Sequence, residues 1–193
     1  MKKVFIILIV ISLLSLGCLQ ADVTLRADKI VDQPWVFSLS CLGDDAKVFL
    51  SIPDDMDWYM FGVGPVYEVA GIEVESMLGF SFYHNGYFAF ESYNPIFILS
   101  KQSRSLSFYS RNIISLDESS NYKNYKAKHY IFFQKTNISL GPEILVNSSS
   151  ETDKIIIGGA IEYDYLNTVF EIFAGKDKKA DKYLVKFELS YTF

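Results

Sequence analysis

Apolar and polar residues alternate with a period of two along most of the chain after residue 22. In the segment 182–193, KYLVKFELSYTF, the apolar positions are Tyr183, Val185, Phe187, Leu189, Tyr191 and Phe193. The polar positions between them are Lys182, Lys186, Glu188, Ser190 and Thr192, and Leu184 is the one exception. A period of two is typical of a β-strand that has one apolar and one polar face. The segment therefore predicts a two-faced strand.

The same alternation recurs in WYMFGVGPVYEV, GIEVESMLGFSFY, NISLGPEILV and KIIIGGAIEYDY, whereas amphipathic helical spacing is nearly absent after residue 22. This pattern predicts an all-β domain. The best count is ten strands, over 35–52, 57–69, 71–83, 86–102, 104–116, 122–135, 138–147, 154–165, 167–175 and 182–193. Turns at SCLGDDAK and SYNP would split 35–52 and 86–102 and give twelve strands. Eight strands result if the N-terminal region stays outside the wall.

The connectors between these strands alternate in length. Short ones lie at 70–71, 84–86, 102–105, 135–137 and 166–167, and longer polar ones at 53–57, 116–124, 147–153 and 175–181, so that strict alternation holds over the C-terminal half. Short periplasmic turns that alternate with longer outer loops are typical of barrels in an outer membrane. We therefore expect an antiparallel up-and-down transmembrane β-barrel over 35–193, preceded by a periplasmic segment over 22–34. An even number of strands places both termini in the periplasm.

The first 21 residues, MKKVFIILIVISLLSLGCLQA, have the pattern of a secretory signal peptide: two lysines, an apolar run and then small residues. The run from Val4 to Leu16 is shorter than the roughly 20 residues that a spanning helix needs. We expect cleavage after Ala21. The alternative is lipidation of Cys18, because SLGC resembles the end of a lipobox, with Ser15 in place of a branched apolar residue.

The last strand also carries a resemblance to a known class of proteins. A terminal strand of alternating apolar residues that ends in an aromatic resembles the C-terminal signature of Gram-negative outer-membrane β-barrel proteins. The matching residues are Phe187, Leu189, Tyr191 and Phe193. The resemblance implies that they are read by the barrel-assembly machinery and that the apolar strand faces contact outer-membrane lipid. A closed barrel pairs every backbone polar group internally, as hydrocarbon requires.

The polar strand faces carry most of the charged residues of the predicted barrel. The registers place on the lumen Glu68, Glu73, Glu75, Glu91, Glu143, Glu162, Asp164, Glu171 and Glu188, together with Arg111, Lys126, Lys128 and Lys186. One interpretation is a cation-preferring pore. The interpretation that we favour is a packed lumen whose charges neutralise each other, because small barrels are filled by their side chains. The formal net charge of −5 argues against a nucleic-acid partner.

The histidines do not match the patterns of enzymatic outer-membrane barrels. Barrel proteases of the omptin type use an Asp pair opposite an Asp–His pair, and barrel phospholipases and lipid A deacylases have a histidine two residues before a serine. His84 is followed by Asn85 and Gly86, and His129 by Tyr130 and Ile131. A catalytic site assembled from residues on distant strands is still an alternative. Two isolated histidines and one mature cysteine, Cys41, predict neither a metal site nor a disulfide, and we expect no cofactor.

Two Gly-Pro pairs, Gly64-Pro65 and Gly141-Pro142, fall inside predicted strands. Because proline cannot donate a ladder hydrogen bond, it marks bulges in strands, and we expect these sites to set the curvature of the wall.

These observations predict a small, monomeric, non-catalytic outer-membrane β-barrel. Its role would be structural, surface interaction or limited passage of small solutes. The first alternative is a secreted or lipid-anchored periplasmic β-barrel that binds an apolar ligand. The second is an outer-membrane lipid-modifying enzyme.

Overall fold

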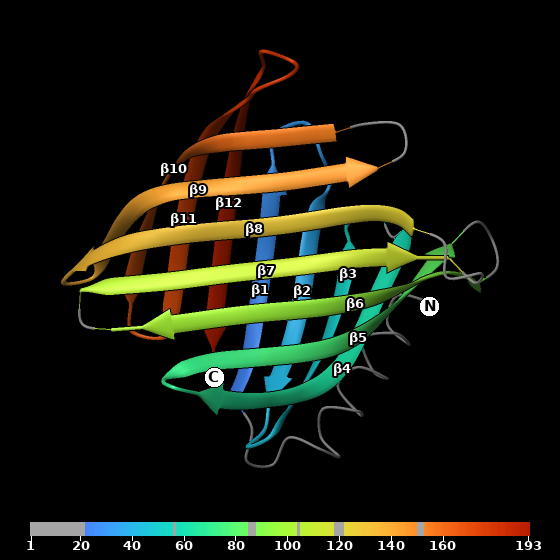
Figure 1. Ribbon diagram of the computed structural model, residues 1–193, viewed down its shortest axis with the longest axis horizontal. Coiled ribbons are helices and arrows are strands. Elements are labelled where there is room, and N and C mark those ends of the chain that lie inside the picture. The colour runs from blue at the N-terminus through green and yellow to red at the C-terminus, as the bar shows by residue number, and fades with distance from the viewer. Residues whose placement is uncertain (1–21, 56, 85–87, 104, 118–121, 150–152) are drawn as a thin grey trace.

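The computed structural model describes residues 22–55, 57–84, 88–103, 105–117, 122–149 and 153–193, and the expected signal peptide with Cys18 lies outside them. The described chain forms one closed antiparallel barrel in which each strand pairs with the next and β1 pairs with β12 (Figure 1). The strands are β1 (Asp22–Ile30), β2 (Trp35–Leu42), β3 (Ala46–Pro53), β4 (Trp58–Val69), β5 (Ile72–His84), β6 (Phe88–Gln102), β7 (Leu106–Leu116), β8 (Tyr122–Lys135), β9 (Ile138–Ser149), β10 (Asp153–Tyr165), β11 (Thr168–Asp177) and β12 (Tyr183–Thr192). Among these residues, no helix is long and apolar enough to cross a membrane.

The prediction of an all-β closed barrel is confirmed, but the expected ten strands are corrected to twelve. Segment 35–52 splits into β2 and β3, because a turn closed by a hydrogen bond from Gly43 N to Ala46 O (2.9 Å) interrupts it. Segment 86–102 does not split. At SYNP the β5–β6 ladder continues through a bulge, where the register shifts between the pairs Ser81–Ser92 and Phe82–Phe90.

The twelfth strand comes from a segment that we expected to precede the barrel. β1 lies within residues 22–34, so the wall begins at Asp22 instead of at residue 35. The alternation in β1 is difficult to recognise from the sequence. Its apolar face consists only of Val23, Leu25 and Ala27, and charged residues lie next to them. β1 and β12 close the barrel, and Phe193 N donates to Val23 O at 2.9 Å beyond the last paired residue.

Two kinds of connector separate the two ends of the barrel. The short turns at 43–45, 70–71, 103–105, 136–137 and 166–167 lie at the end where Asp22 and Phe193 also lie. The connectors at 31–34, 54–57, 85–87, 117–121, 150–152 and 178–182 join strands at the opposite end. β5, β9, β10 and β11 extend further into these connectors than the sequence predicts. His84-Asn85-Gly86, the expected hairpin tip, falls mainly outside the described residues.

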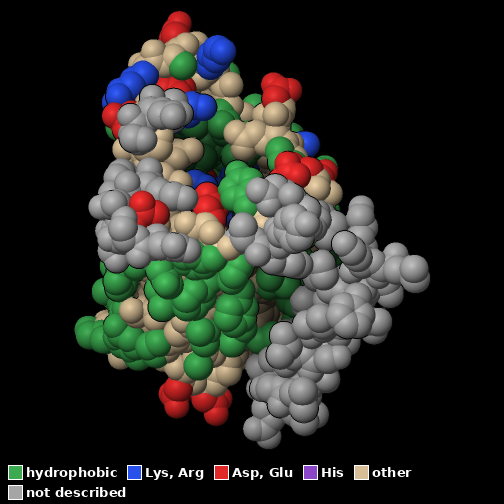
Figure 2. Space-filling view, turned by 90° about the vertical axis from the view of Figure 1, so that its right-hand side faces the viewer, with side chains coloured by type: hydrophobic (Ala, Val, Ile, Leu, Met, Phe, Trp, Pro, Cys, Tyr) green, Lys and Arg blue, Asp and Glu red, His purple; other side chains and the backbone are tan. Residues whose placement is uncertain are grey.

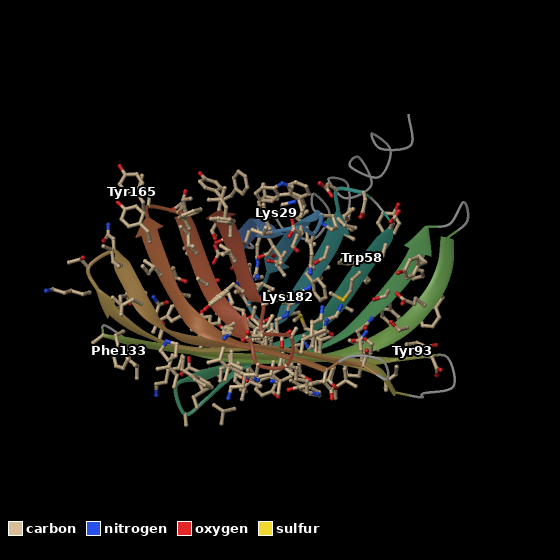
Figure 3. All side chains as sticks on the ribbon, turned by 90° about the horizontal axis from the view of Figure 1, so that it is seen from above. Lys29, Trp58, Tyr93, Phe133, Tyr165 and Lys182 are labelled. Atoms are coloured by element: carbon tan, nitrogen blue, oxygen red, sulfur yellow. The ribbon has the colours of Figure 1, made fainter. Side chains whose placement is uncertain are left out.

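The wall has an apolar outer face and a largely polar inner face. On β12, Tyr183, Leu189 and Tyr191 are exposed, whereas Lys186 between them is 5% exposed. Seen from above, Tyr165 and Phe133 point away from the enclosed space, and Trp58 lies within it (Figure 3). Hydrophobic side chains cover the lower part of the face in Figure 2, and charged side chains gather above them. Strand alternation thus directs large apolar side chains outward.

Two apolar clusters fill part of the interior. The first contains Phe49, Met77, Ile96, Ile98 and Ile113. The second contains Phe132, Ile156, Ala160 and Phe173, and its two phenylalanines are fully buried. The first cluster joins side chains of β3, β5, β6 and β7, and the second joins side chains of β8, β10 and β11, so apolar packing occupies part of the barrel interior.

The Gly-Pro pairs interrupt the sheet ladders as the sequence predicts. The β4–β5 pairing is broken at Gly64 and Pro65, and the β8–β9 pairing at Gly141 and Pro142. A Cβ atom on Gly141 would lie 2.0 Å from the carbonyl oxygen of Ile131, and one on Gly64 would lie 2.1 Å from that of Ser76. Only glycine allows these backbone approaches, and β8 and β9 bend strongly in Figure 1.

Candidate functional site: the charged barrel interior

A compact network of ion pairs occupies the inner face of β8, β9, β11 and β12. Lys186 Nζ lies 2.6 Å from Glu171 Oε1, 3.1 Å from Glu143 Oε1 and 3.3 Å from Glu188 Oε2. Lys128 Nζ lies 3.0 Å from Glu171 Oε2 and 3.1 Å from Glu188 Oε2. Both ammonium groups therefore bridge the same carboxylates, and the network joins strands that are not neighbours in the wall.

The network is buried and internally neutralised to a large degree. Glu143 is 0% exposed and Glu171 is 2% exposed. On β11 and β12, Glu171 and Glu188 lie directly opposite each other, an arrangement that is destabilising for two like charges. The lysines remove this repulsion. Burying such a carboxylate without a cation would carry a large desolvation cost, so the two lysines are required for this packing.

Arg26 on β1 extends the network across the seam of the barrel. Its guanidinium contacts Asp28 at 2.9 Å and Glu188 Oε2 at 2.9 Å. Neither Arg26 nor Asp28 is among the predicted lumen residues, because the segment 22–34 was expected to precede the wall. The alternation of Thr24, Arg26 and Asp28 with apolar residues was the signal that could have found them.

A cavity of about 250 Å³ lies beside this network and is lined by residues of β1, β2, β3, β5, β6, β7 and β12. Its charged lining residues are Arg26, Lys47, Glu75, Arg111 and Glu188. Its hydroxyl groups come from Thr24, Ser38, Ser40, Ser51, Tyr109 and Ser190, and its apolar floor from Phe49, Met77, Ile96 and Ile98. The cavity is smaller than the roughly 300–1,000 Å³ typical of sites for drug-sized ligands, and charged, hydroxyl and apolar side chains share its lining.

Two charged groups of the cavity lining have buried atoms without a hydrogen-bond partner. Lys47 Nζ bonds Glu75 Oε1 at 2.8 Å, and Glu75 Oε2 has no partner. Arg111 Nε likewise has none. Each such atom leaves a hydrogen-bonding capacity unused in a region of low dielectric constant, which is energetically unfavourable.

Four of the remaining predicted lumen residues lie toward the end with the short turns, whereas Glu91 and Lys126 lie nearer the opposite end, close to where β6 and β8 begin. The strand registers place Glu68 opposite Glu73, and Glu162 opposite Glu171, on the inner face. Asp164 follows on the same face of β10. Among the residues that the structure describes, Glu68, Glu73, Glu162 and Asp164 form no ion pair with a described lysine or arginine. The inner face at this end is therefore acidic.

A second polar group lies on the outer face of the wall. Ser110 Oγ and His129 Nδ1 are 2.9 Å apart on opposite positions of β7 and β8. Asn112 Nδ2 donates to Ser110 Oγ at 3.2 Å, and Tyr125 Oη donates to Asn112 Oδ1 at 2.6 Å. This group is not predictable from the residues next to His129 in sequence, because Ser110 lies on the neighbouring strand.

The Ser110–His129 contact lacks the arrangement of a catalytic serine site. In a serine triad, a third group orients the imidazole through the nitrogen that does not face the serine. Here Asn112 bonds the serine, and no described residue is seen to orient the imidazole from its other nitrogen. Within the described ranges, no group of three or more His, Cys, Asp or Glu side chains could hold a metal ion.

The fold and the interior define a twelve-stranded β-barrel of the outer-membrane type, in agreement with the resemblance of the terminal strand. The KdgM porin has a similar structure, with a TM-score of 0.61 and 12% identity over 89% of this chain and 99% of that one. The NanC porin gives a TM-score of 0.57 and 11% identity over 89% and 98% of the two chains. No family model matches the sequence, and no curated protein matches it.

At this level of identity the likeness shows a common fold. One of the similar structures is described as the KdgM porin in complex with disordered oligogalacturonate. In that structure the oligogalacturonate is a ligand of the KdgM porin.

Proposed function

We propose that this protein is an outer-membrane channel of narrow bore that admits small polar solutes. The observation that carries the proposal is the distribution of side chains in the wall. Large hydrophobic residues such as Phe61, Phe97 and Ile161 are exposed on the outer face, and charged and hydroxyl groups surround the internal cavity. Such a surface suits lipid outside and water or a polar solute inside.

The likeness to two porins supports the same proposal. KdgM and NanC are matched over nearly their full lengths, so the likeness in fold extends along the whole of each porin barrel. The ion pairs of Lys128 and Lys186 narrow the interior, and the clusters around Ile96 and Phe132 narrow it further. We therefore expect low conductance and a strict size limit.

The apolar-ligand alternative receives less support from the structure. A barrel that binds an apolar ligand needs a pocket lined mainly by hydrophobic side chains. Here the cavity carries five charged residues and six hydroxyl groups, while the extended apolar surface is on the outside. The enzyme alternative is disfavoured by the incomplete arrangement around Ser110 and His129.

Conductance in planar bilayers tests the proposal. The purified protein, first shown to be folded by a heat-dependent shift in gel mobility, is added to a bilayer in KCl. We expect small, resolved current steps and, because carboxylates outnumber cations on the inner face, a reversal potential that favours K⁺. A folded, membrane-inserted protein that gives no current and no solute-dependent swelling of liposomes would contradict the proposal.

A further inference from the structure

Two charged residues that line the cavity beside the ion-pair network each have one buried side-chain atom without a hydrogen-bond partner. Arg111 Nε and Glu75 Oε2 are buried and have no hydrogen-bond partner, and both residues line the cavity. Glu75 as a whole is 4% exposed. The two groups have opposite charges, and neither is paired with the other.

The strand registers fix the relation between these two residues. Glu75 on β5 lies opposite Ile98 on β6, and Ile98 lies opposite Arg111 on β7. Glu75 and Arg111 therefore flank Ile98 on one row of the inner face. Two strand spacings separate their Cα atoms by about 10 Å. Both side chains are long enough to reach toward a small molecule lying over Ile98.

The other charges of the cavity are already engaged. Arg26 is held by Asp28 and Glu188, and Lys47 by Glu75 Oε1. A solute that carries only a negative charge would satisfy Arg111 and leave Glu75 Oε2 without a partner. A solute that carries only a positive charge would do the reverse. A solute that carries both charges would provide a partner for Arg111 and a partner for Glu75 Oε2.

We propose that this cavity is a transit site for small zwitterions that carry one carboxylate and one ammonium group, an inference that rests on the channel function proposed above. The carboxylate pairs with Arg111, whose planar guanidinium suits carboxylate geometry. The ammonium group pairs with Glu75. A dipeptide spans at most about 7 Å, so its two ends can meet side chains that project from positions about 10 Å apart.

The rest of the lining fits the middle of such a solute. Ser38, Ser51 and Tyr109 offer hydroxyl groups to a peptide bond, and Ile98 offers an apolar surface between the charged ends. Ser38 Oγ and Ser51 Oγ are 2.8 Å apart, which leaves lone pairs and a proton for further bonds. A cavity of about 250 Å³ limits the solute to a small one.

Liposome swelling tests this inference with two probes of similar size, each of which has a net charge of zero. The folded protein is reconstituted, and swelling rates are measured in glycylglycine, a zwitterion, and in arabinose, a neutral sugar. We expect glycylglycine to enter faster. In Glu75→Gln and Arg111→Gln, the ratio of the two rates should fall by roughly threefold to tenfold, the change that one hydrogen bond makes to a binding constant. Arg111→Lys should give an intermediate ratio.

The matched control is Lys179→Gln, whose side chain is 62% exposed in the connector 178–182 and distant from the cavity. It should keep the wild-type ratio. Equal rates for the two probes in the wild-type protein, or a ratio unchanged in both cavity variants, would overturn the zwitterion site while KCl currents and swelling still supported a channel. Loss of all current and all swelling in the wild-type protein would overturn the channel and the site together.

Discussion

Lys186 and Glu171 are joined by a contact of 2.6 Å across the β11–β12 pair, and both side chains are almost completely enclosed. The lysine also holds Glu143 and Glu188, so one ammonium group serves three carboxylates. The charges that the sequence placed on one side of separate strands thus form a single structural unit that ties β9, β11 and β12 together.

Replacing Lys186 by glutamine should destabilise the barrel strongly, because Glu143 and Glu171 would keep buried charges with one cation fewer. Removing one partner of a buried ion pair typically costs about 3–5 kcal/mol. Equilibrium unfolding in guanidinium, followed by tryptophan fluorescence in detergent micelles, measures the change. Lys179→Gln, which breaks an exposed pair with Asp153, should change stability by about 1 kcal/mol or less. Similar losses in the two variants would show that the internal network contributes little.

Alanine at Gly141 should impair folding, because its Cβ would lie 2.0 Å from the carbonyl oxygen of Ile131, where only backbone movement could relieve the overlap. We expect a loss of at least about 1–3 kcal/mol, the usual cost of overpacking. Gly159→Ala is the matched control, since the nearest atom to its Cβ is 3.8 Å away. The heat-dependent gel shift reports the folded fraction. If both variants folded like the wild type, the close approach of β8 and β9 would be relaxed more easily than the structure implies.

A lysine at Ile157 should destabilise the inserted barrel by about 2–4 kcal/mol, the cost of a cation on the lipid face near the middle of the bilayer. Asp164→Lys, on the inner face of the same strand and beside Glu162, should cost less than about 1 kcal/mol because the new cation enters an acidic part of the interior. Unfolding from lipid vesicles in urea compares the two. The reverse order would mean that the apolar face of β10 points inward.

Removing the Phe193 side chain should reduce assembly in the membrane, if the resemblance of the terminal strand to the outer-membrane signature extends to its recognition. Its ring contacts Tyr191 with centroids 4.8 Å apart, and the side chain is exposed. Phe193→Ala keeps the backbone hydrogen bond to Val23, so the variant isolates the side chain. Leu166→Ala removes another exposed apolar side chain at the same end and should have no effect. Heat-modifiable protein in membrane fractions is the readout, and equal behaviour would remove the basis for an aromatic signal.

The β-barrel could be predicted from sequence because the alternation that indicates each strand is a local pattern. Alternation along β12, β10 and β5 needs only neighbouring residues, and it also identifies the inner face that carries Glu75, Glu143 and Glu171. The turn at Gly43 was recognised as an alternative split. β1 was missed because a nine-residue strand with Arg26 and Asp28 has weak apolar periodicity, and its place depends on a partner at the far end of the chain.

The site could not be predicted from sequence, because it depends on strand registers. The strand pairings between β5, β6 and β7 and between β9, β11 and β12 determine which carboxylates contact Lys186. They also determine which carboxylate oxygens have no hydrogen-bond partner. The outer Ser110–His129 contact has the same origin, since the two residues are brought together only by the β7–β8 register.

The seam between β1 and β12 has a consequence for the order of folding. Thr24 and Thr192, whose hydroxyl groups are 3.0 Å apart, are separated by 168 positions in the chain. Hairpins such as β4–β5 can form from short-range contacts, but ring closure must overcome the entropy of one very large loop. An incomplete ring exposes two strand edges, which hydrocarbon does not tolerate. We therefore expect closure to be the slow and aggregation-prone step of biogenesis, which makes this seam the place where an external assembly factor has the most to contribute.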